Sequence, residues 1–521
     1  MLRSYLVLFS SLAIVAPPAL SQLATSQYNN QRTGANLAET KLTPANVNSR
    51  DFGKLFSLKV DGDVYAQPLV VPRLEMPGQG KHDVVFIATE HDSVYAFDAD
   101  KKAQPLWHVS FLDAAKVTAI PAQHLRCPFI NPEVGITSTP VIDLEQGTLF
   151  VLARTMEQAS DPPYKYLQRL HALDITTGKE RPGSPVEIKA TVTAEDREGK
   201  RHEIVFDPLV ENPRAALLLV NGTVYLTWAS SCDVGDYHGW VIAYDARSLQ
   251  QKGVFITSPN GKEGGIWQGD TGPAADLSGN VFVVTGNGDF DGSAGNDYSD
   301  SILKLTFDRD KLLVRDYFTP HDQARLNSKD LDLGGGGPML LPDQNGPHPH
   351  LALAGGKDGA LFLIDRDHMG KFQAGADDVV QIVKLKGSLL AAPAYWNHHV
   401  YVFNDDDVLH DLKVTEGKLS REHDASGAPT NPGATPTISA NGDRDGIAWT
   451  ISTRTWQVFP ERLAVLHAYD AADVSRELYN STENSDRDQA GISVRFTIPS
   501  VVAGHVYVGA RSEVDVYGLL H

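Results

Sequence analysis

The chain has 521 residues, of which 42% are hydrophobic and 21% are charged, with 44 glycines and 30 prolines. A formal net charge of −19, with no cluster of Lys and Arg, argues against a nucleic-acid partner, because binding to phosphates needs a basic surface. No segment keeps apolar residues at a sustained 3.6-residue spacing, so we expect few helices and a β-rich fold.

The first 21 residues have the pattern of an export signal. Arg3 supplies a positive charge, an apolar run extends from Leu6 to Val15, and Ala19 to Ser21 fit a small-residue cleavage site. The run is too short for a comfortable membrane span, and no later stretch qualifies. We therefore expect a secreted or periplasmic monomer without a membrane span, with residues 22–521 forming a single domain.

One strand pattern recurs eight times along the chain. Each copy alternates apolar and polar residues, and most copies end in an Asp, Gly or Lys turn. The copies are VYAFDAD (94–100), LHALDITTG (170–178), VIAYDARS (241–248), ILKLTFDRD (302–310), LFLIDRDHMG (361–370), VLHDLKVTEG (408–417), VLHAYDAAD (465–473) and VDVYGLL (514–520). Such regular repetition of strand units is typical of a β-propeller.

Each repeat also contains a short strand of small residues, an apolar strand and a more polar outer strand. The small-residue strands, such as AQPLVV (66–71) and AAPAYW (391–396), suit the crowded axis of a propeller. The last repeat stops after its third strand, and residues 54–60 can supply the fourth. We therefore predict an all-β, eight-bladed propeller of four-stranded antiparallel blades, closed by an N-terminal strand that hides two sheet edges.

Two cysteines, Cys127 and Cys232, lie on connections that would reach the same face of the propeller. In an exported protein they are expected to form a disulfide, and the alternative is a pair of buried free thiols.

The repeats resemble the pyrroloquinoline-quinone-like (PQQ-like) β-propellers, as in VYAFDADKKAQPLW (94–107) and GIWQGDTGPAADLSGNVFVVTGNG (265–288). The segments NPEVGITSTPVID (131–143) and LHAYDAADVSRELYNS (466–481) are similar to a secreted bacterial subgroup of that family. The resemblance implies a fold and raises PQQ as a cofactor. Alcohol-oxidising members hold PQQ under two adjacent cysteines, and this chain has no adjacent pair. Barrel-assembly members of the family act as binding platforms without PQQ, so the cofactor remains open.

Loops that enter the blades, and loops that join their second and third strands, converge on one propeller face. We expect a ligand there, against an aromatic wall with polar partners. The candidate ligand-binding residues are Trp240, Trp267, Asn287, Arg454, Trp456 and Arg511. Alternatively, these tryptophans only cover blade ends and the polar groups satisfy loop backbone.

Two classes of function remain open. The first is an exported propeller that binds a small molecule, glycan or protein on its loop-rich face. The second is an enzyme, such as a PQQ-type oxidoreductase, with candidate acid–base residues His91, His238, Asp270 and Lys357. A weak Ca²⁺ site is conceivable at Asp289, Asp291 and Asp297, although an Asp-rich turn is the simpler interpretation.

Overall fold

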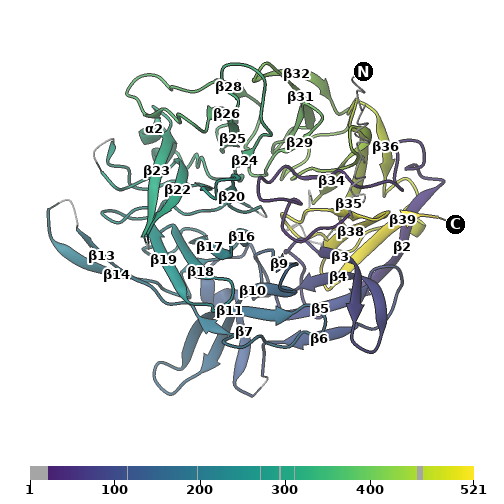
Figure 1. Cartoon of the computed structure of the whole chain (residues 1–521), viewed down its shortest axis with the longest axis horizontal. Helices are drawn as coiled ribbons and strands as arrows, with labels where there is room; N and C mark the ends of the chain where they lie inside the picture. Colours follow the sequence, from purple (N-terminus) through teal and green to yellow (C-terminus); the bar gives the residue numbers. More distant parts are fainter. Residues whose placement is uncertain are drawn as a thin grey trace, which may run out of the picture.

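The computed structural model describes residues 21–113, 115–195, 198–269, 271–292, 295–309, 311–453 and 462–520. Eight antiparallel sheets surround a central axis as the blades of a propeller, which confirms the predicted fold (Figure 1). The expected export signal lies outside the described residues except for Ser21.

The first four blades are formed in chain order. Blade 1 contains β3 (Leu69–Met76), β4 (Gly80–Ala88), β5 (Ser93–Asp98) and β6 (Trp107–Ser110). Blade 2 contains β9 (Val141–Asp143), β10 (Thr148–Gln158), β11 (Tyr164–Asp174) and β12 (Val186–Glu187), and is extended by β7 (Val117–Pro121) and β8 (Glu133–Val134). Blade 3 contains β16 (Leu218–Val220), β17 (Thr223–Ser230), β18 (Trp240–Asp245) and β19 (Gln251–Ile256), with β15 (Glu211–Asn212) on β17. Blade 4 contains β20 (Ala274–Ala275), β21 (Val281–Val284), β22 (Ile302–Asp308) and β23 (Lys311–Thr319), and β27 (Lys371–Phe372) joins β23 in parallel.

The remaining blades complete the ring. Blade 5 contains β24 (Met339–Leu340), β25 (Leu351–Gly355), β26 (Ala360–Asp365) and β28 (Gln381–Lys384). Blade 6 contains β29 (Ala394–Trp396), β30 (His399–Phe403), β31 (Leu409–Thr415) and β32 (Lys418–Asp424). Blade 7 contains β33 (Thr437–Asn441), β34 (Arg444–Ser452), β35 (Val465–Asp470) and β36 (Glu477–Asn480), with β1 (Ala35–Asn36) parallel to β33. Blade 8 contains β37 (Ser500–Val502), β38 (His505–Ala510), β39 (Glu513–Leu519) and β2 (Phe52–Lys59).

Short elements decorate the ring. A hairpin of β13 (Thr191–Glu195) and β14 (Arg201–Val205) leaves blade 2 and projects from the left rim in Figure 1. The helices of the described residues are α1 (Ala122–Leu125), α2 (Gln323–Ser328) and α3 (Ser485–Asp488). None of the helices in these parts of the chain is both long and apolar enough to cross a bilayer.

The N-terminal strand closes the ring as predicted. Strand β2 pairs antiparallel with β39, from Phe52 opposite Leu519 to Lys59 opposite Glu513, and the two strands run side by side at the right of Figure 1. Phe52 is fully buried and packs edge-on against Tyr479 of blade 7, with 4.9 Å between the ring centroids. The closing strand is therefore anchored by apolar packing as well as by backbone hydrogen bonds.

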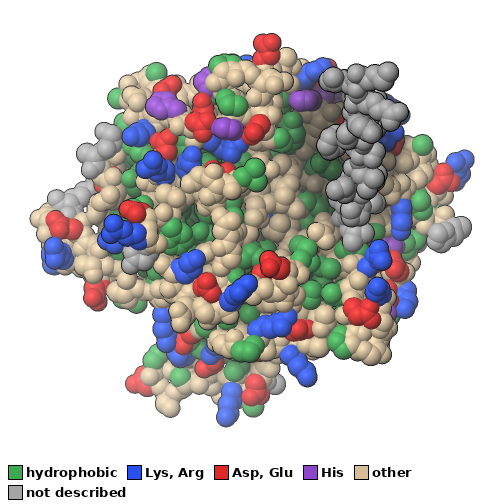
Figure 2. All heavy atoms as spheres, in the orientation of Figure 1, with side chains coloured by type: hydrophobic (Ala, Val, Ile, Leu, Met, Phe, Trp, Pro, Cys, Tyr) green, Lys and Arg blue, Asp and Glu red, His purple; other side chains and the backbone are tan. Residues whose placement is uncertain are grey.

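The hydrophobic core is divided into layers between neighbouring blades. One layer, for example, joins Phe282 of β21 to Phe362 of β26, and Phe318 of β23 packs on Phe362 at 5.1 Å. Outer strands are more exposed than the strands they cover; in β32, for example, Leu419 is buried and most other residues are exposed, because the outer strand meets solvent. The face drawn in Figure 2 carries charges of both signs around its rim and hydrophobic side chains nearer the axis.

Residues 22–39 cross the central channel, which the sequence does not predict. Backbone hydrogen bonds join this segment to inner strands of six blades: Leu23 to Val70, Ala24 to Ile142, Asn30 to Ala275, Gln31 to Leu340, Thr33 to Tyr395 and Gly34 to Ile438. Its central side chain, Arg32, is fully buried and donates hydrogen bonds to the carbonyl oxygens of Leu217 and Pro273. We call residues 22–39 the axial segment, since it links the blades through the channel.

Candidate functional site

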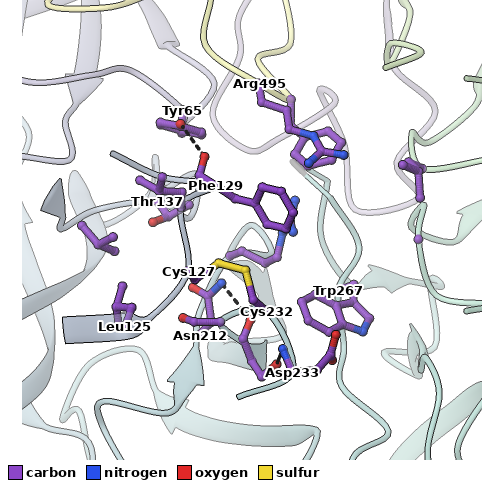
Figure 3. Close-up of a pocket in the computed structure, with 18 of the residues that line it drawn as sticks. Tyr65, Leu125, Cys127, Phe129, Thr137, Asn212, Cys232, Asp233, Trp267 and Arg495 are labelled. Atoms are coloured by element: carbon purple, nitrogen blue, oxygen red, sulfur yellow. Dashed lines mark hydrogen bonds between the residues drawn. A yellow bond between two sulfur atoms is a disulfide. The ribbon is translucent and has the colours of Figure 1, made fainter. Parts of the chain in front are cut away.

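A cavity of about 300 Å³ lies near the propeller axis, where several inner strands begin (Figure 3). We call it the axial cavity. Its lining includes the aromatic residues Tyr65, Phe129, Trp267 and Phe496, the basic residues Arg154, Arg214, Lys357 and Arg495, the acidic residues Asp233, Asp330 and Asp332, and both cysteines.

Much of this lining follows from one topological rule. Five lining residues each lie four positions before the start of an inner strand, namely Tyr65, Thr137, Arg214, Leu390 and Phe496 before β3, β9, β16, β29 and β37. Because these inner strands start at this end of the axis, the residues before them reach the cavity. Arg214, Arg495 and Phe496 are not among the site residues expected from the sequence, although this position in the repeat could have identified Arg214 and Phe496.

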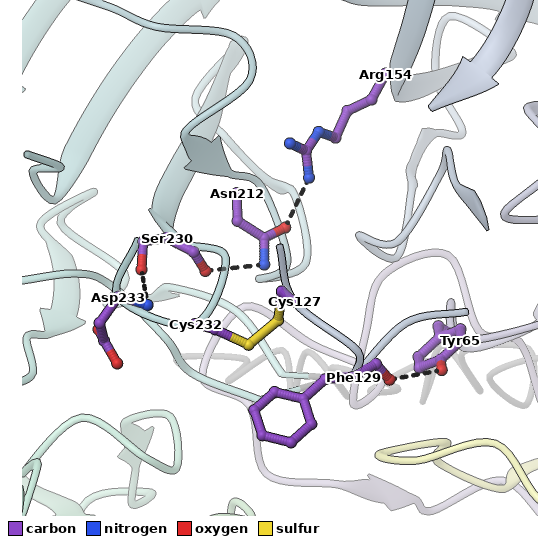
Figure 4. The surroundings of a disulfide bond; sticks show 8 residues. All are labelled: Tyr65, Cys127, Phe129, Arg154, Asn212, Ser230, Cys232 and Asp233. Atoms are coloured by element: carbon purple, nitrogen blue, oxygen red, sulfur yellow. Dashed lines mark hydrogen bonds between the residues drawn. A yellow bond between two sulfur atoms is a disulfide. The ribbon is translucent and has the colours of Figure 1, made fainter. Parts of the chain in front are cut away.

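The two cysteines form a disulfide in the cavity wall, which confirms the predicted pairing (Figure 4). The bond joins the loop that enters blade 2 to the loop between β17 and β18 of blade 3. Beside it, Arg154 donates to Asn212 Oδ1 at 3.2 Å, and Asn212 donates to the carbonyl of Ser230 at 3.1 Å. The wall is therefore fixed by covalent and polar links between two blades.

Positive charge gathers around one aromatic ring. The guanidinium groups of Arg214 and Arg495 lie 4.6 and 4.3 Å from the ring centroid of Phe496, and Arg495 also lies 5.3 Å from the centroid of Phe129. In Figure 3 the Arg495 side chain reaches toward the ring of Phe129. Guanidinium groups stacked on these rings gather positive charge in this corner, which suits a carboxylate or a similar anion.

Lys357, another basic residue of the cavity lining, forms ion pairs with two carboxylates. Its Nζ donates to Asp330 at 2.8 Å and to Asp332 at 2.5 Å. Burial alone would lower the pKa of Lys357, but these two carboxylates raise it above its ordinary value. Lys357 is therefore held as a cation, which suits it to binding charge rather than to acting as a base.

Trp267 and Asn287 lie on the blade 4 side of the cavity. Trp267 lines the cavity, and its buried indole N–H has no hydrogen-bond partner among the described residues. Asn287 lies behind the lining, where its side chain donates to Asp330 at 2.8 Å and its backbone N–H to Asp332 at 2.7 Å. The structure thus brings Trp267, Asn287 and Lys357 into one region.

Trp240 and His238 lie away from the axial cavity. Trp240 is fully buried and packs in the core layer between blades 2 and 3, so it does not form part of an exposed aromatic wall. His238 is 7% exposed, and burial lowers its pKa to about 4, which leaves a neutral imidazole beside Ser258 at 3.1 Å. Both residues are buried among neighbouring side chains, and neither lines the axial cavity.

His91 and Arg511 lie around a second pocket of about 340 Å³, lined in part by Asp61, Asp63, Glu90, Glu133 and Arg511. We call it the acidic pocket. His91 contacts its lining through Glu133, at 2.6 Å between Nδ1 and Oε1. Three further candidates, Asp270, Arg454 and Trp456, lie outside the described residues.

The proposed calcium site has the features of a tight turn. Asp291 accepts backbone hydrogen bonds from Asn296 and Asp297, Asp289 accepts one from Lys262, and Asp297 accepts one from Asn260. In the described ranges, no group of three or more His, Cys, Asp or Glu side chains is arranged to hold a metal ion. The geometry therefore adds no support for calcium at this turn.

Comparison with solved structures identifies relatives of the fold. The quinohemoprotein alcohol dehydrogenase ADHIIG from Pseudomonas putida HK5 aligns with 96% of this chain and 80% of its own, with a TM-score of 0.63 and 15% identity. A europium-containing methanol dehydrogenase aligns with 96% of this chain and 98% of its own, with a TM-score of 0.61 and 14% identity. BamB from Moraxella catarrhalis aligns with 90% of this chain and 99% of its own, with a TM-score of 0.50 and 13% identity.

No protein-family model and no curated protein sequence matches the chain. At these identities the solved structures show a shared fold, the propeller of the quinoprotein dehydrogenases, and leave the reaction to be argued from the site.

Proposed function

We propose that this protein binds a flat, anionic small molecule in the axial cavity. The observation that carries the proposal is the pair of guanidinium groups, from Arg214 and Arg495, that share the ring of Phe496 at the cavity wall. With Lys357 and Arg154, four basic side chains line a cavity that also has four aromatic rings. Aromatic surfaces hold a flat ring, and the basic groups hold its carboxylates.

The size of the cavity agrees with such a ligand. Its volume of about 300 Å³ is near the lower end of small-molecule sites, which favours a compact aromatic acid over a protein segment. The disulfide and the Arg154–Asn212–Ser230 hydrogen bonds hold the wall in place before binding, which lowers the entropic cost of association.

Binding can be measured by calorimetry with a series of aromatic acids that differ in the number of carboxylates. We expect affinity to rise with that number and to fall at least tenfold in Arg495→Gln. Arg444→Gln, an exposed residue of β34, is the matched control and should bind like the parent. Equal affinity for charged acids and their neutral amides would overturn the proposal.

A second candidate is a PQQ-type oxidoreductase, favoured by the disulfide that lines the cavity. PQQ is a flat quinone with several carboxylates, so the lining described above fits its chemistry. Arg214, Arg495 and Lys357 would hold the carboxylates, and Trp267 would offer its indole ring and its unpartnered N–H. When bound, the quinone would accept electrons from a small substrate. Adjacent cysteines are absent, but Cys127 and Cys232 place a disulfide at the cavity nonetheless.

This candidate is tested by titrating the purified protein with PQQ, with and without Ca²⁺, and following absorbance and tryptophan fluorescence. Saturable binding followed by dye reduction with primary alcohols would support an oxidoreductase. Saturable binding without any dye reduction would favour a binding function, and an absence of PQQ binding would exclude this candidate.

We also propose that the chain is exported, because a disulfide is typical of oxidising compartments. A fusion of residues 1–21 to a reporter that is active only outside the cytoplasm should be active. An inactive fusion would contradict this assignment.

A further inference from the structure

The acidic pocket is not used by the proposed ligand of the axial cavity. Four carboxyl groups line it, from Asp61, Asp63, Glu90 and Glu133, against one guanidinium group from Arg511. They come from the loop before β3, the turn between β4 and β5, strand β8 of blade 2 and the turn between β38 and β39. The pocket is therefore built by three blades, and its charge is predominantly negative.

Glu90 provides an independent observation that points to a ligand. Its side chain is 1% exposed, and Oε2 accepts hydrogen bonds from Gly135 N at 2.7 Å and from Thr137 Oγ1 at 3.2 Å. Its other oxygen, Oε1, is buried without a hydrogen-bond partner in the described ranges of the chain. A buried acceptor without a donor costs free energy, so a ligand that donates a hydrogen bond there is stabilised.

The other carboxylates are fixed around the pocket by neighbouring side chains. Asp61 accepts from Thr89 Oγ1 at 2.9 Å and from Ser93 Oγ at 2.6 Å. His91 contacts Glu133, and Arg511 lies 3.4 Å from Asp63. These groups are spread around the walls, and the described residues include no cluster that could share one metal ion. Dispersed acceptors in a space of about 340 Å³ suit an organic cation with several N–H donors.

We propose that the acidic pocket binds a small organic ammonium ion, such as a diamine, with one N–H donated to Glu90. This site is distinct from the axial cavity but adjoins it. Glu90 lines the acidic pocket, whereas its partner Thr137 lines the axial cavity. A cation bound here lies beside the wall of the proposed anion site.

The site has a built-in pH dependence. Burial raises the pKa of Glu90 to about 8, and the negative charge of Asp63 adds to the effect while Arg154 opposes it. Asp92 also faces Glu90, and Asp61, Glu133, His91 and Arg511 complete the charged surroundings. Glu90 is protonated below pH 8 and ionised above it, so a cation binds more tightly as pH rises and displaces a proton near neutral pH.

Calorimetry with 1,4-diaminobutane, and with 1,4-butanediol as its neutral counterpart, tests the proposal. We expect saturable binding of the diamine alone, about tenfold tighter at pH 8.5 than at pH 6.5. At pH 7.5 the measured enthalpy should change with the ionisation enthalpy of the buffer, because a proton is released.

Two variants with opposite expected effects separate binding from folding. Glu90→Gln keeps an acceptor for Gly135 but loses the charge, and should weaken diamine binding about tenfold at pH 8.5 and remove its pH dependence. Arg511→Gln removes the resident cation and should tighten binding. Glu483→Gln, on an exposed loop, is the control, and melting curves check that each variant is folded.

The proposal is overturned if the folded parent shows no saturable diamine binding, or if Glu90→Gln binds the diamine as the parent does. Either result leaves the axial cavity untouched, because its test uses anionic ligands and different residues.

Discussion

Asp300 shows how one buried side chain can organise a site. It is fully buried two residues before β22, where it accepts hydrogen bonds from Leu333 N at 3.1 Å and from Gln323 Nε2 at 3.2 Å. Burial raises its pKa to about 8, and the nearby charge of Asp332 contributes. Asp300 therefore holds the backbone beside Asp332 and Lys357 while it is itself protonated at neutral pH.

This raised pKa predicts a pH-dependent stability. The folded chain binds more protons than the unfolded chain between pH 3.8, the ordinary value for Asp, and pH 8, so stability falls as pH rises through this range. The slope is up to about 1.4 kcal/mol per pH unit for one group. We expect Asp300→Asn, which keeps an acceptor for Leu333, to lose much less stability than the parent between pH 6 and pH 8.5 in urea denaturation. The exposed Asp343→Asn should behave like the parent, and identical slopes in all three proteins would contradict the assignment.

Arg32 has the reverse arrangement, a buried cation with neutral partners. Burial lowers its pKa to about 9, so it stays protonated at neutral pH, and it also donates to Thr25 Oγ1 at 2.8 Å and Ser26 O at 2.7 Å. These bonds, with those to Leu217 and Pro273, connect the axial segment to the blade 3 and blade 4 side of the channel.

We expect Arg32→Leu to lower the free energy of unfolding by about 3 kcal/mol, because several buried carbonyl oxygens lose their donor. Arg50→Leu is the control, since the Arg50 side chain is 85% exposed and its solvent-screened ion pair with Asp51 contributes little to stability. Denaturant unfolding measures both, and equal stability of the two variants would show that the axial segment is not held through Arg32.

At the scale of elements, loops between blades are joined covalently. The disulfide closes a loop of 105 residues between the entry to blade 2 and the β17–β18 loop. Strands alone do not fix these loops relative to each other, since each belongs to a different sheet. The bond therefore links the geometry of the cavity wall to the stability of two blades.

Replacing both Cys127 and Cys232 with alanine should lower the free energy of unfolding by about 4 kcal/mol in the loop-entropy account. It should also weaken binding of an aromatic acid in the axial cavity, because the wall loses its cross-link. A reducing agent should reproduce both effects in the parent and change nothing in the double variant. Unchanged melting temperature and affinity would contradict this role.

At the scale of the whole molecule, stability depends on closure of the ring. Strand β2 hides the edge of β39, and it is fixed by Lys54 at 2.7 Å from Asp515 and by Ser57 Oγ, which donates to the same carboxylate at 2.7 Å. Asp515 is fully buried and also accepts Gly491 N at 2.6 Å. The closing strand and blade 8 therefore share one buried polar centre.

Closure predicts that a chain lacking residues 52–59 exposes the edge of β39 and uncovers the aromatic layer around Phe52. We expect aggregation, or a melting temperature lowered by 10 °C or more, the effect of about 10 kcal/mol in a chain of this size. Size-exclusion chromatography and thermal melts check this. A variant that stays monomeric and melts like the parent would show that β2 is dispensable.

The sequence by itself determined the repeating architecture: eight units, their strand order, the closing strand and the pairing of Cys127 with Cys232. These features are local or repeated, because alternation of apolar residues and turn chemistry act within each unit of the chain.

The axial cavity is different. Its walls come from positions as distant as Tyr65 and Phe496, which meet only after the ring has closed. Single residues also depended on tertiary packing, which buries Trp240 between two blades and leaves Trp267 at the cavity. The sequence pattern does not predict the path of the axial segment either, because this segment bonds to strands of many blades and forms little regular structure of its own.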